Sequence, residues 1–168
     1  GQYIPSFYGY QGAKPAATMD ESFPDVMNYV ENHYKVAKDK AHRAICGLSM
    51  GGGHSFDISR RFPTKFDYIG LFSAGLHVST TGDFRNDFYK QLQGNEEAKT
   101  QLATLFKNKP KLYWIGMGKT DFLYKSSADL RRYFDEKGYK YTYLETEGGH
   151  IWRNWRVYLT EFAQKIFK

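Results

Sequence analysis

The stretch ICGLSMGGG, residues 45–53, places a serine between glycines directly after a short apolar run. Gly47, Ser49 and Gly51 match the pattern Gly-x-Ser-x-Gly, in which a strand leads into a sharp turn that exposes the serine and a helix follows. Side chains at Gly47 and Gly51 are expected to collide with the neighbouring strand and helix. Ser49 could also be an ordinary turn serine, because this pattern arises by chance in about one chain in twenty of this length. A nucleophilic role therefore needs a base and an acid elsewhere in the sequence.

The composition favours one globular domain, which we assign to residues 1–168. Hydrophobic residues make up 41% and charged residues 25%, so the chain is not expected to be disordered. Aromatic residues make up 18%, which suits core packing and also stacking on sugar rings or flat ligands. The composition alone does not separate these two uses.

Several partner classes are not expected. The net charge is +6, but the Lys and Arg residues are scattered along the chain and mixed with acidic residues, so we expect no nucleic-acid partner. No apolar run approaches the ~20 residues of a membrane span, and no stretch resembles a signal peptide. Cys46 is the only cysteine and excludes an internal disulfide without indicating a compartment. The histidines show no metal-ligand spacing, so no metal and no cofactor are expected.

Strands and helices are predicted to alternate. Ser22 is a candidate N-cap for a first helix, and Pro63 is expected to end the helix that follows the glycines. Residues 73–110 are mostly polar, with weak helical segments around 84–93 and 96–108, and read as an insertion or cap. Residues 1–21 read as an extended surface segment. The predicted strands are 42–46, 67–72, 111–118 and 139–147, and the helices are 22–34, 54–62, 126–138 and 155–167. This alternation predicts an α/β fold with about four parallel strands flanked by helices.

Two further residues follow strand ends in the order that serine hydrolysis needs. Asp121 follows the third predicted strand and His150 follows the fourth. In a parallel sheet both would lie at the same edge as Ser49. The order Ser, Asp, His is found in α/β hydrolases. Asp121 could instead cap a helix, and His150 could be an exposed loop histidine.

Other acids and histidines are weaker candidates for these roles. Asp129 and Asp135 fall within a predicted helix. His77, in the insertion, is the remaining histidine best placed to reach the cleft, where we expect it to bind substrate. The others are placed on helices or at a strand start: His33, His42 and His54.

The segments HRAICGLSMGGGHSF, FDYIGLFSAGLH, GKTDFLY and GGHIWRNWRVYL resemble the family described as "Putative esterase". This family includes feruloyl and acetyl xylan esterases of carbohydrate esterase family 1 and belongs to the esterase D-like branch of the α/β hydrolases. The resemblance runs from about residue 15 to the C-terminus. It implies Ser49 as nucleophile, His150 as base, Asp121 as acid and the Met50 N–H as one oxyanion donor. It also implies acyl or feruloyl esters of plant polysaccharides as substrates, and a secreted or periplasmic location.

The sequence departs from this family before the elbow. Members carry several earlier strands and a His-Gly loop that completes the oxyanion hole, whereas only 48 residues precede Ser49 here. The chain therefore reads as the C-terminal part of an α/β-hydrolase fold, without the N-terminal strands. We expect an open edge at the first strand, covered by a second copy or a separate N-terminal fragment. Loss of one oxyanion donor costs roughly 10²- to 10³-fold in rate, so the chain alone should be a poor catalyst.

The expected reaction is acyl transfer to Ser49 followed by hydrolysis. Because the base must be neutral, activity should rise with pH through about 6.5, where an ordinary histidine loses its proton. Phe122, Tyr124 and Trp152 adjoin the triad in sequence and are expected to bind substrate, although plain packing explains them equally well. Two alternatives stay open: a non-catalytic carbohydrate-binding or assembly module, and an enzyme of the thioesterase or S-formylglutathione hydrolase kind.

Overall fold

The computed structural model describes residues 18–78 and 84–168, and its centre is a parallel sheet. In the order β1-β2-β3-β4, the strands are Ala44–Leu48, Tyr68–Phe72, Leu112–Gly118 and Thr142–Thr146. The register pairs Leu48 with Phe72 and Phe72 with Gly116, so the carboxyl ends of the strands meet at one edge. The predicted α/β class with four parallel strands is confirmed. The first strand lies two residues further along than expected and continues to the turn at Ser49.

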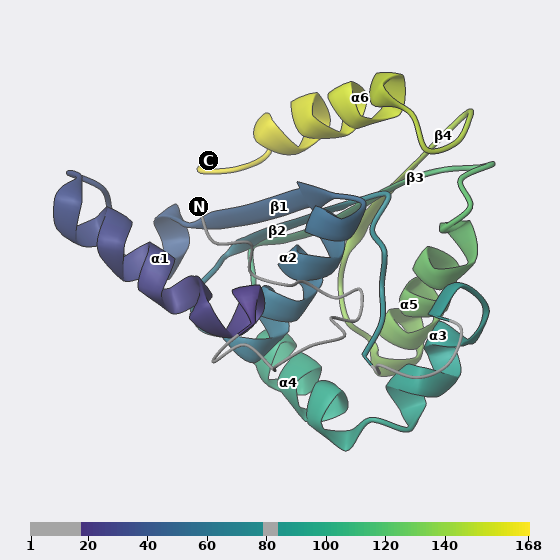
Figure 1. Ribbon diagram of the computed structural model, residues 1–168, viewed down its shortest axis with the longest axis horizontal. Coiled ribbons are helices and arrows are strands. Elements are labelled where there is room, and N and C mark those ends of the chain that lie inside the picture. Colours follow the sequence, from purple (N-terminus) through teal and green to yellow (C-terminus); the bar gives the residue numbers. More distant parts are fainter. Residues whose placement is uncertain (1–17, 79–83) are drawn as a thin grey trace, which may run out of the picture.

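The helices form a layer on each face of the sheet, as Figure 1 shows. The elements are α1 (Met19–His33), α2 (Met50–Arg61), α3 (Phe84–Gln93), α4 (Glu96–Lys107), α5 (Tyr124–Lys137) and α6 (Trp152–Ala163), with a short 3-10 turn at Lys40–His42. α2, α4 and α5 lie below the sheet in this view, and α6 lies above it. α2 ends at Arg61 before Pro63, as predicted, because proline disfavours a helical conformation at the residue before it.

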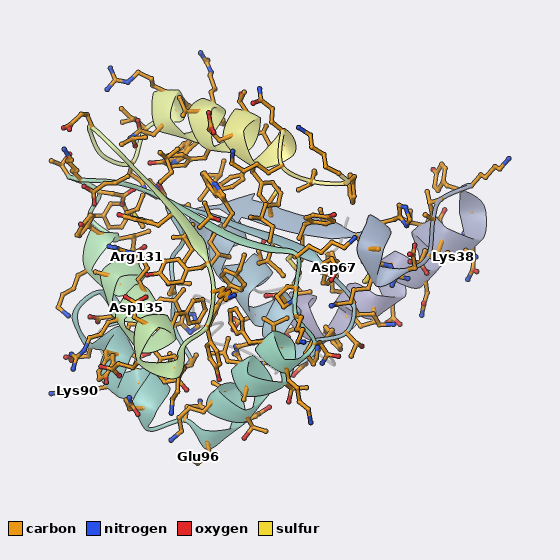
Figure 2. All side chains as sticks on the ribbon, turned by 180° about the vertical axis from the view of Figure 1, so that it is seen from behind. Lys38, Asp67, Lys90, Glu96, Arg131 and Asp135 are labelled. Atoms are coloured by element: carbon orange, nitrogen blue, oxygen red, sulfur yellow. The ribbon has the colours of Figure 1, made fainter. Side chains whose placement is uncertain are left out.

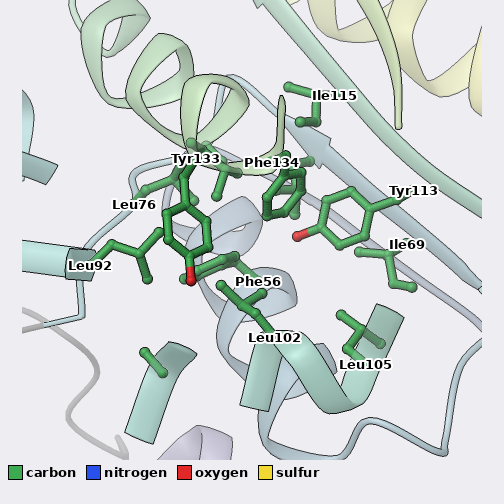
Figure 3. Packing of buried hydrophobic residues seen from close by; sticks show 14 of the residues in the cluster. Phe56, Ile69, Leu76, Leu92, Leu102, Leu105, Tyr113, Ile115, Tyr133 and Phe134 are labelled. Atoms are coloured by element: carbon green, nitrogen blue, oxygen red, sulfur yellow. The ribbon is translucent and has the colours of Figure 1, made fainter. Parts of the chain in front are cut away.

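The sheet separates two hydrophobic clusters. Tyr113 and Ile115 of β3 enter the larger cluster beneath the sheet, whereas Trp114 between them enters the smaller one beneath α6. This alternation is the period of two that a strand imposes on its side chains. Figure 3 shows the larger cluster, in which Phe56 of α2 and Phe134 of α5 lie with Leu102 and Leu105 of α4. Both faces of the sheet are therefore packed, as parallel sheets require.

Residues 73–110 differ from the expected insertion or cap. Phe88 and Leu92 of α3 and Leu102 and Leu105 of α4 are fully buried in the larger cluster. Their charged neighbours, including Lys90 and Glu96 in Figure 2, point outwards. The described part of this segment is thus amphipathic and contributes to the main core. Residues 79–83 lie outside the described residues, as do residues 1–17 of the extended segment expected at residues 1–21, whereas residues 19–21 belong to α1.

The first helix begins earlier than predicted. Thr18 is its N-cap, and the Thr18 hydroxyl accepts from the Glu21 N–H while the Glu21 carboxylate accepts from the Thr18 N–H. This reciprocal capping box satisfies two donors at once. The expected N-cap, Ser22, lies inside the helix, where its hydroxyl donates to the Thr18 carbonyl. The assignment of Ser22 was therefore wrong.

Candidate active site

Ser49 occupies a strained turn between β1 and α2. Its φ angle is +53°, in a region that residues with a side chain rarely adopt. The Ser49 N–H donates to the Phe72 carbonyl at 2.9 Å, and the Ser49 carbonyl accepts from Gly53 at 3.2 Å and Gly75 at 2.9 Å. These hydrogen bonds hold the strained conformation in place. The side chain is presented at the carboxyl edge of the sheet.

The collision expected for a side chain beside Ser49 is confirmed at Gly47 but not at Gly51. A Cβ atom at Gly47 would lie 2.2 Å from the Gly51 carbonyl oxygen, so β1 and α2 can approach only if residue 47 has no side chain. A Cβ atom at Gly51 would meet nothing within 4 Å, which overturns the expected collision there. At Gly52 a Cβ atom would lie 2.7 Å from Ala74 Cβ. Gly47 and Gly52 are therefore the positions at which packing demands glycine.

His150 joins the other two predicted triad residues. Its Nε2 lies 2.9 Å from Ser49 Oγ, and its Nδ1 lies 2.9 Å from Asp121 Oδ2. The Asp121 side chain has no exposed surface, and its Oδ1 accepts from the Leu123 N–H at 2.9 Å. The structure thus brings Ser49, His150 and Asp121 together in one hydrogen-bonded series.

The hydrogen bonds also assign the direction in which a proton can move. An ionised carboxylate can only accept, so His150 Nδ1 donates to Asp121. In the neutral ring Nε2 is then unprotonated and accepts from the Ser49 hydroxyl. Ser49 consequently faces a nitrogen that is able to take its proton.

The loop that carries His150 is fixed by Asn154 of α6. The buried Asn154 amide donates to the carbonyls of Glu147 and Gly149, both at 3.0 Å. The Thr120 N–H also donates to the Gly148 carbonyl at 3.1 Å, which joins this loop to the one that carries Asp121. Base and acid are therefore held on loops that are bonded to each other.

Met50 is the first residue of α2 and follows Ser49 directly. The N-terminus of a helix carries partial positive charge and attracts negative charge. The Met50 N–H therefore has the position that an oxyanion donor beside Ser49 requires. Its assignment to that role stays a prediction.

Phe122, one of the residues predicted to bind substrate, lies beside the triad. The Phe122 ring centre lies 4.8 Å from that of His150, and 59% of Phe122 is exposed. Trp152 is 67% exposed and packs against Trp155, whose ring in turn contacts His150. The exposed Phe122 ring therefore contacts His150 directly, whereas the Trp155 ring lies between the exposed Trp152 ring and His150.

Tyr124 and His77 have other surroundings. The Tyr124 hydroxyl donates to Glu145 of β4 at 2.8 Å, and Arg131 lies over the Tyr124 ring. Tyr124, the first residue of α5, thus packs against β4 and a later turn of its own helix. Burial, followed by the charge of Arg60, lowers the pKa of His77 to about 4, while the Asp20 carboxylate acts in the opposite direction. His77 thus lies near charged groups of α1 and α2, and a role in substrate binding stays a prediction for both residues.

A buried polar cluster lies between α1 and α2. His54 Nδ1 lies 2.7 Å from Asp20 Oδ1, and this hydrogen bond raises the pKa of His54. Burial raises the pKa of Asp57 to about 6, although Arg60 opposes the shift and donates to Asp57 at 2.9 Å. This cluster ties the helix that follows Ser49 to α1.

Two residues beside the triad were missed by the sequence analysis. Trp155 contacts the His150 ring and donates through Nε1 to the hydroxyl of Ser73, which directly follows β2. The position of Ser73 at a strand end was a usable signal, because strand ends had located Asp121 and His150. Trp155 lies one helical turn after Trp152 in α6, and i, i+3 residues share a helix face.

The described part of the chain contains neither a candidate metal site nor a candidate membrane span. Within residues 18–78 and 84–168, no group of three or more His, Cys, Asp or Glu side chains could hold a metal ion. None of the described helices has the length and apolar character of a membrane span.

The parallel sheet and the Ser49 turn define part of an α/β-hydrolase fold. The profile of the family described as "Putative esterase" matches residues 24–166, and the chain belongs to this family. The solved structure of a ferulic acid esterase superposes with a TM-score of 0.69 at 23% identity, over 95% of this chain and 64% of that one.

Two curated relatives are esterases by name. An acetyl esterase of Caldicellulosiruptor saccharolyticus is 25% identical over 164 residues, covering 86% of this chain and 61% of that protein. An endo-1,4-beta-xylanase/feruloyl esterase of Xylanibacter ruminicola is 29% identical over 154 residues, covering 89% of this chain and 17% of that protein. The chain therefore spans less than two thirds of the length of either relative.

Proposed function

We propose that the protein is a serine esterase in which Ser49 is the nucleophile, His150 the general base and Asp121 the acid that orients the base. The observation that carries the proposal is the continuous series of hydrogen bonds from Ser49 Oγ through His150 to Asp121, with both steps at 2.9 Å. Family membership supports the same class of chemistry.

The first half of the reaction forms an acyl-serine. His150 Nε2 takes the Ser49 proton as Oγ attacks the ester carbonyl carbon. The carbonyl electron pair moves to oxygen, where the Met50 N–H stabilises the negative charge. When the carbonyl re-forms, the alcohol leaves and receives the proton from His150.

The second half releases the acid. Water attacks the acyl carbon while His150 takes one of its protons, and a second tetrahedral oxyanion forms at the same donors. Collapse breaks the bond to Ser49 Oγ, which regains a proton from His150. Asp121 accepts from Nδ1 throughout, which stabilises the imidazolium at each step.

For the substrate we propose feruloyl or acetyl esters on xylan. The names of the two curated relatives, an acetyl esterase and a xylanase/feruloyl esterase, support these acyl groups. The exposed rings of Phe122 and Trp152 supply flat apolar surface near His150, which suits an aromatic acyl group or a sugar ring.

A substrate panel tests the proposal. Hydrolysis of p-nitrophenyl acetate, a feruloyl ester and a thioester is measured for the wild type, Ser49→Ala and the control Ser22→Ala. We expect ester hydrolysis that Ser22→Ala retains and that Ser49→Ala loses by about 10³-fold or more. Hydrolysis of the thioester alone would contradict the substrate class. A folded protein that binds xylo-oligosaccharide and hydrolyses nothing would favour a non-catalytic carbohydrate-binding module.

Variants of the two exposed aromatic residues test the acyl group. Phe122→Ala and Trp152→Ala should raise KM for the feruloyl ester by about 3- to 10-fold more than for the acetyl ester, because only the feruloyl group gains from ring contacts. Equal changes in KM for both esters would contradict a stacking role for these two residues.

A further inference from the structure

Trp155 packs against the imidazole that the proposed mechanism depends on. Its ring centre lies 5.0 Å from that of His150, with an angle of 83° between the planes. This edge-to-face arrangement is favourable between aromatic rings. The environment of His150 is therefore set by α6 as well as by Ser49 and Asp121.

Ser73 fixes the position of this indole. Trp155 Nε1 donates to Ser73 Oγ at 3.2 Å, and Ser73 is completely buried. The Ser73 φ angle is +45°, and its N–H donates to the Gly116 carbonyl at 2.9 Å. A non-glycine residue keeps such a φ angle only where its surroundings enforce it, so the acceptor for the indole is rigidly placed.

The two hydrogen bonds of His150 leave one motion open. They join Nδ1 to Asp121 and Nε2 to Ser49. The ring can still turn by a small angle about its Cβ–Cγ bond, because hydrogen bonds weaken steeply only at large misalignment, and the side chain is about one-fifth exposed. Contact with a fixed neighbour opposes this rotation, which would otherwise move Nε2 away from Ser49 Oγ.

We propose that Ser73 and Trp155 are positioning residues: Ser73 tethers the indole of Trp155, and the tethered indole holds the His150 ring in line with Ser49. The inference rests on the proposed function, since alignment matters when Nε2 takes a proton from Ser49. Neither residue touches the reacting atoms. They act by fixing the orientation of the His150 ring.

A double-mutant cycle tests the tether. Trp155→Phe keeps an aromatic ring but removes the indole donor, and Ser73→Ala removes the acceptor while keeping a Cβ atom. Each is expected to lower kcat on p-nitrophenyl acetate by about 3- to 10-fold with KM unchanged, as loss of one hydrogen bond implies. The double variant should be no slower than either single variant, because both changes remove the same interaction.

Tyr158→Phe is the matched control. It removes one hydrogen bond of another aromatic residue of α6, one helical turn after Trp155, because the buried Tyr158 hydroxyl is hydrogen-bonded to Thr146 at 2.6 Å. We expect its kcat on p-nitrophenyl acetate to stay within twofold of the wild type. An equal loss in Tyr158→Phe, or losses in Ser73→Ala and Trp155→Phe that multiply in the double variant, would overturn the proposal.

A proton NMR measurement separates this inference from the proposed function. The proton that His150 Nδ1 donates to Asp121 is observed directly in the wild type, in the two single tether variants and in the control. We expect its signal to broaden or shift in Ser73→Ala and Trp155→Phe and to stay unchanged in Tyr158→Phe. An unchanged signal in both tether variants would overturn the positioning role. A wild type that hydrolyses no ester would instead contradict the proposed function.

Discussion

Asp121 and His150 follow neighbouring strands, β3 and β4, and their side chains meet at 2.9 Å although 29 residues separate them in the sequence. The Asp121 side chain is completely shielded from solvent, while His150 is partly exposed. The acid thus lies behind the base, and the base lies between the acid and Ser49. In this order Asp121 orients the His150 ring and stabilises the imidazolium that forms when Nε2 takes the Ser49 proton.

Replacing Asp121 by Asn should disable the base without unfolding the protein. The Asn oxygen can still accept from the Leu123 N–H, as Asp121 does at 2.9 Å. Its NH₂ group would face His150 Nδ1 and favour the tautomer with the proton on Nε2, which cannot accept from Ser49. We expect kcat to fall by about 10⁴-fold. Steady-state kinetics on p-nitrophenyl acetate measure this, with the exposed Asp135→Asn as the control.

Two neighbouring glycines should respond oppositely to alanine. Gly52→Ala places a Cβ atom 2.7 Å from Ala74 Cβ, and such overpacking destabilises by about 1–3 kcal/mol. Gly51→Ala meets open space within α2 and should be neutral or stabilise by up to about 1 kcal/mol, because alanine favours a helix over glycine. Thermal unfolding of the two variants checks this. A Gly51→Ala protein that is the less stable of the two would refute it.

The shifted pKa of His77 predicts a loss of stability in acid. Burial, followed by Arg60, lowers its pKa to about 4, whereas an unfolded histidine has a pKa near ~6.5. Between these values the unfolded state binds a proton that the folded state does not, so this contribution to stability is present above pH ~6.5 and falls as the pH drops to about 4. The slope is at most about 1.4 kcal/mol per pH unit, and partial exposure of His77 reduces it.

Comparison with His77→Gln isolates this contribution. The raised pKa values of His54 and Asp57 act in the opposite direction, because there the folded state binds the proton more tightly, and both remain in the variant. We expect the free energy of unfolding of the wild type minus that of His77→Gln to decrease from pH 7 to pH 4. A difference that is independent of pH would exclude burial of a neutral His77.

The outer edge of β1 is predicted to be an association surface. β1 pairs with β2 on one side, and no other strand within residues 18–78 and 84–168 pairs with it. Beside this edge lies an apolar groove lined by Cys46, Leu48, Trp152 and Leu159, among others. Light scattering is expected to give the mass of at least two copies of the 19.5 kDa chain, or the mass of one chain with a tightly bound second fragment. A species of 19.5 kDa at all concentrations would contradict this.

The sequence predicted the features that depend on local pattern. Each of the triad residues follows a strand, and parallel pairing brings strand ends together, so Ser49, Asp121 and His150 could be grouped in advance. The contribution of residues 73–110 to the core was missed because their buried residues are few and widely spaced among polar ones. The bond between Trp155 and Ser73 spans 82 residues and depends on how α6 crosses the sheet, which no local pattern encodes.

The most direct test of the central claim is the reaction of the protein with a fluorophosphonate. Such a reagent bonds covalently to a serine whose hydroxyl is activated by a neighbouring base. Peptide mass spectrometry should find the adduct on Ser49, and it should disappear in Ser49→Ala and become much slower in His150→Ala. A folded protein that stays unlabelled at Ser49, or is labelled equally fast without His150, would contradict the account.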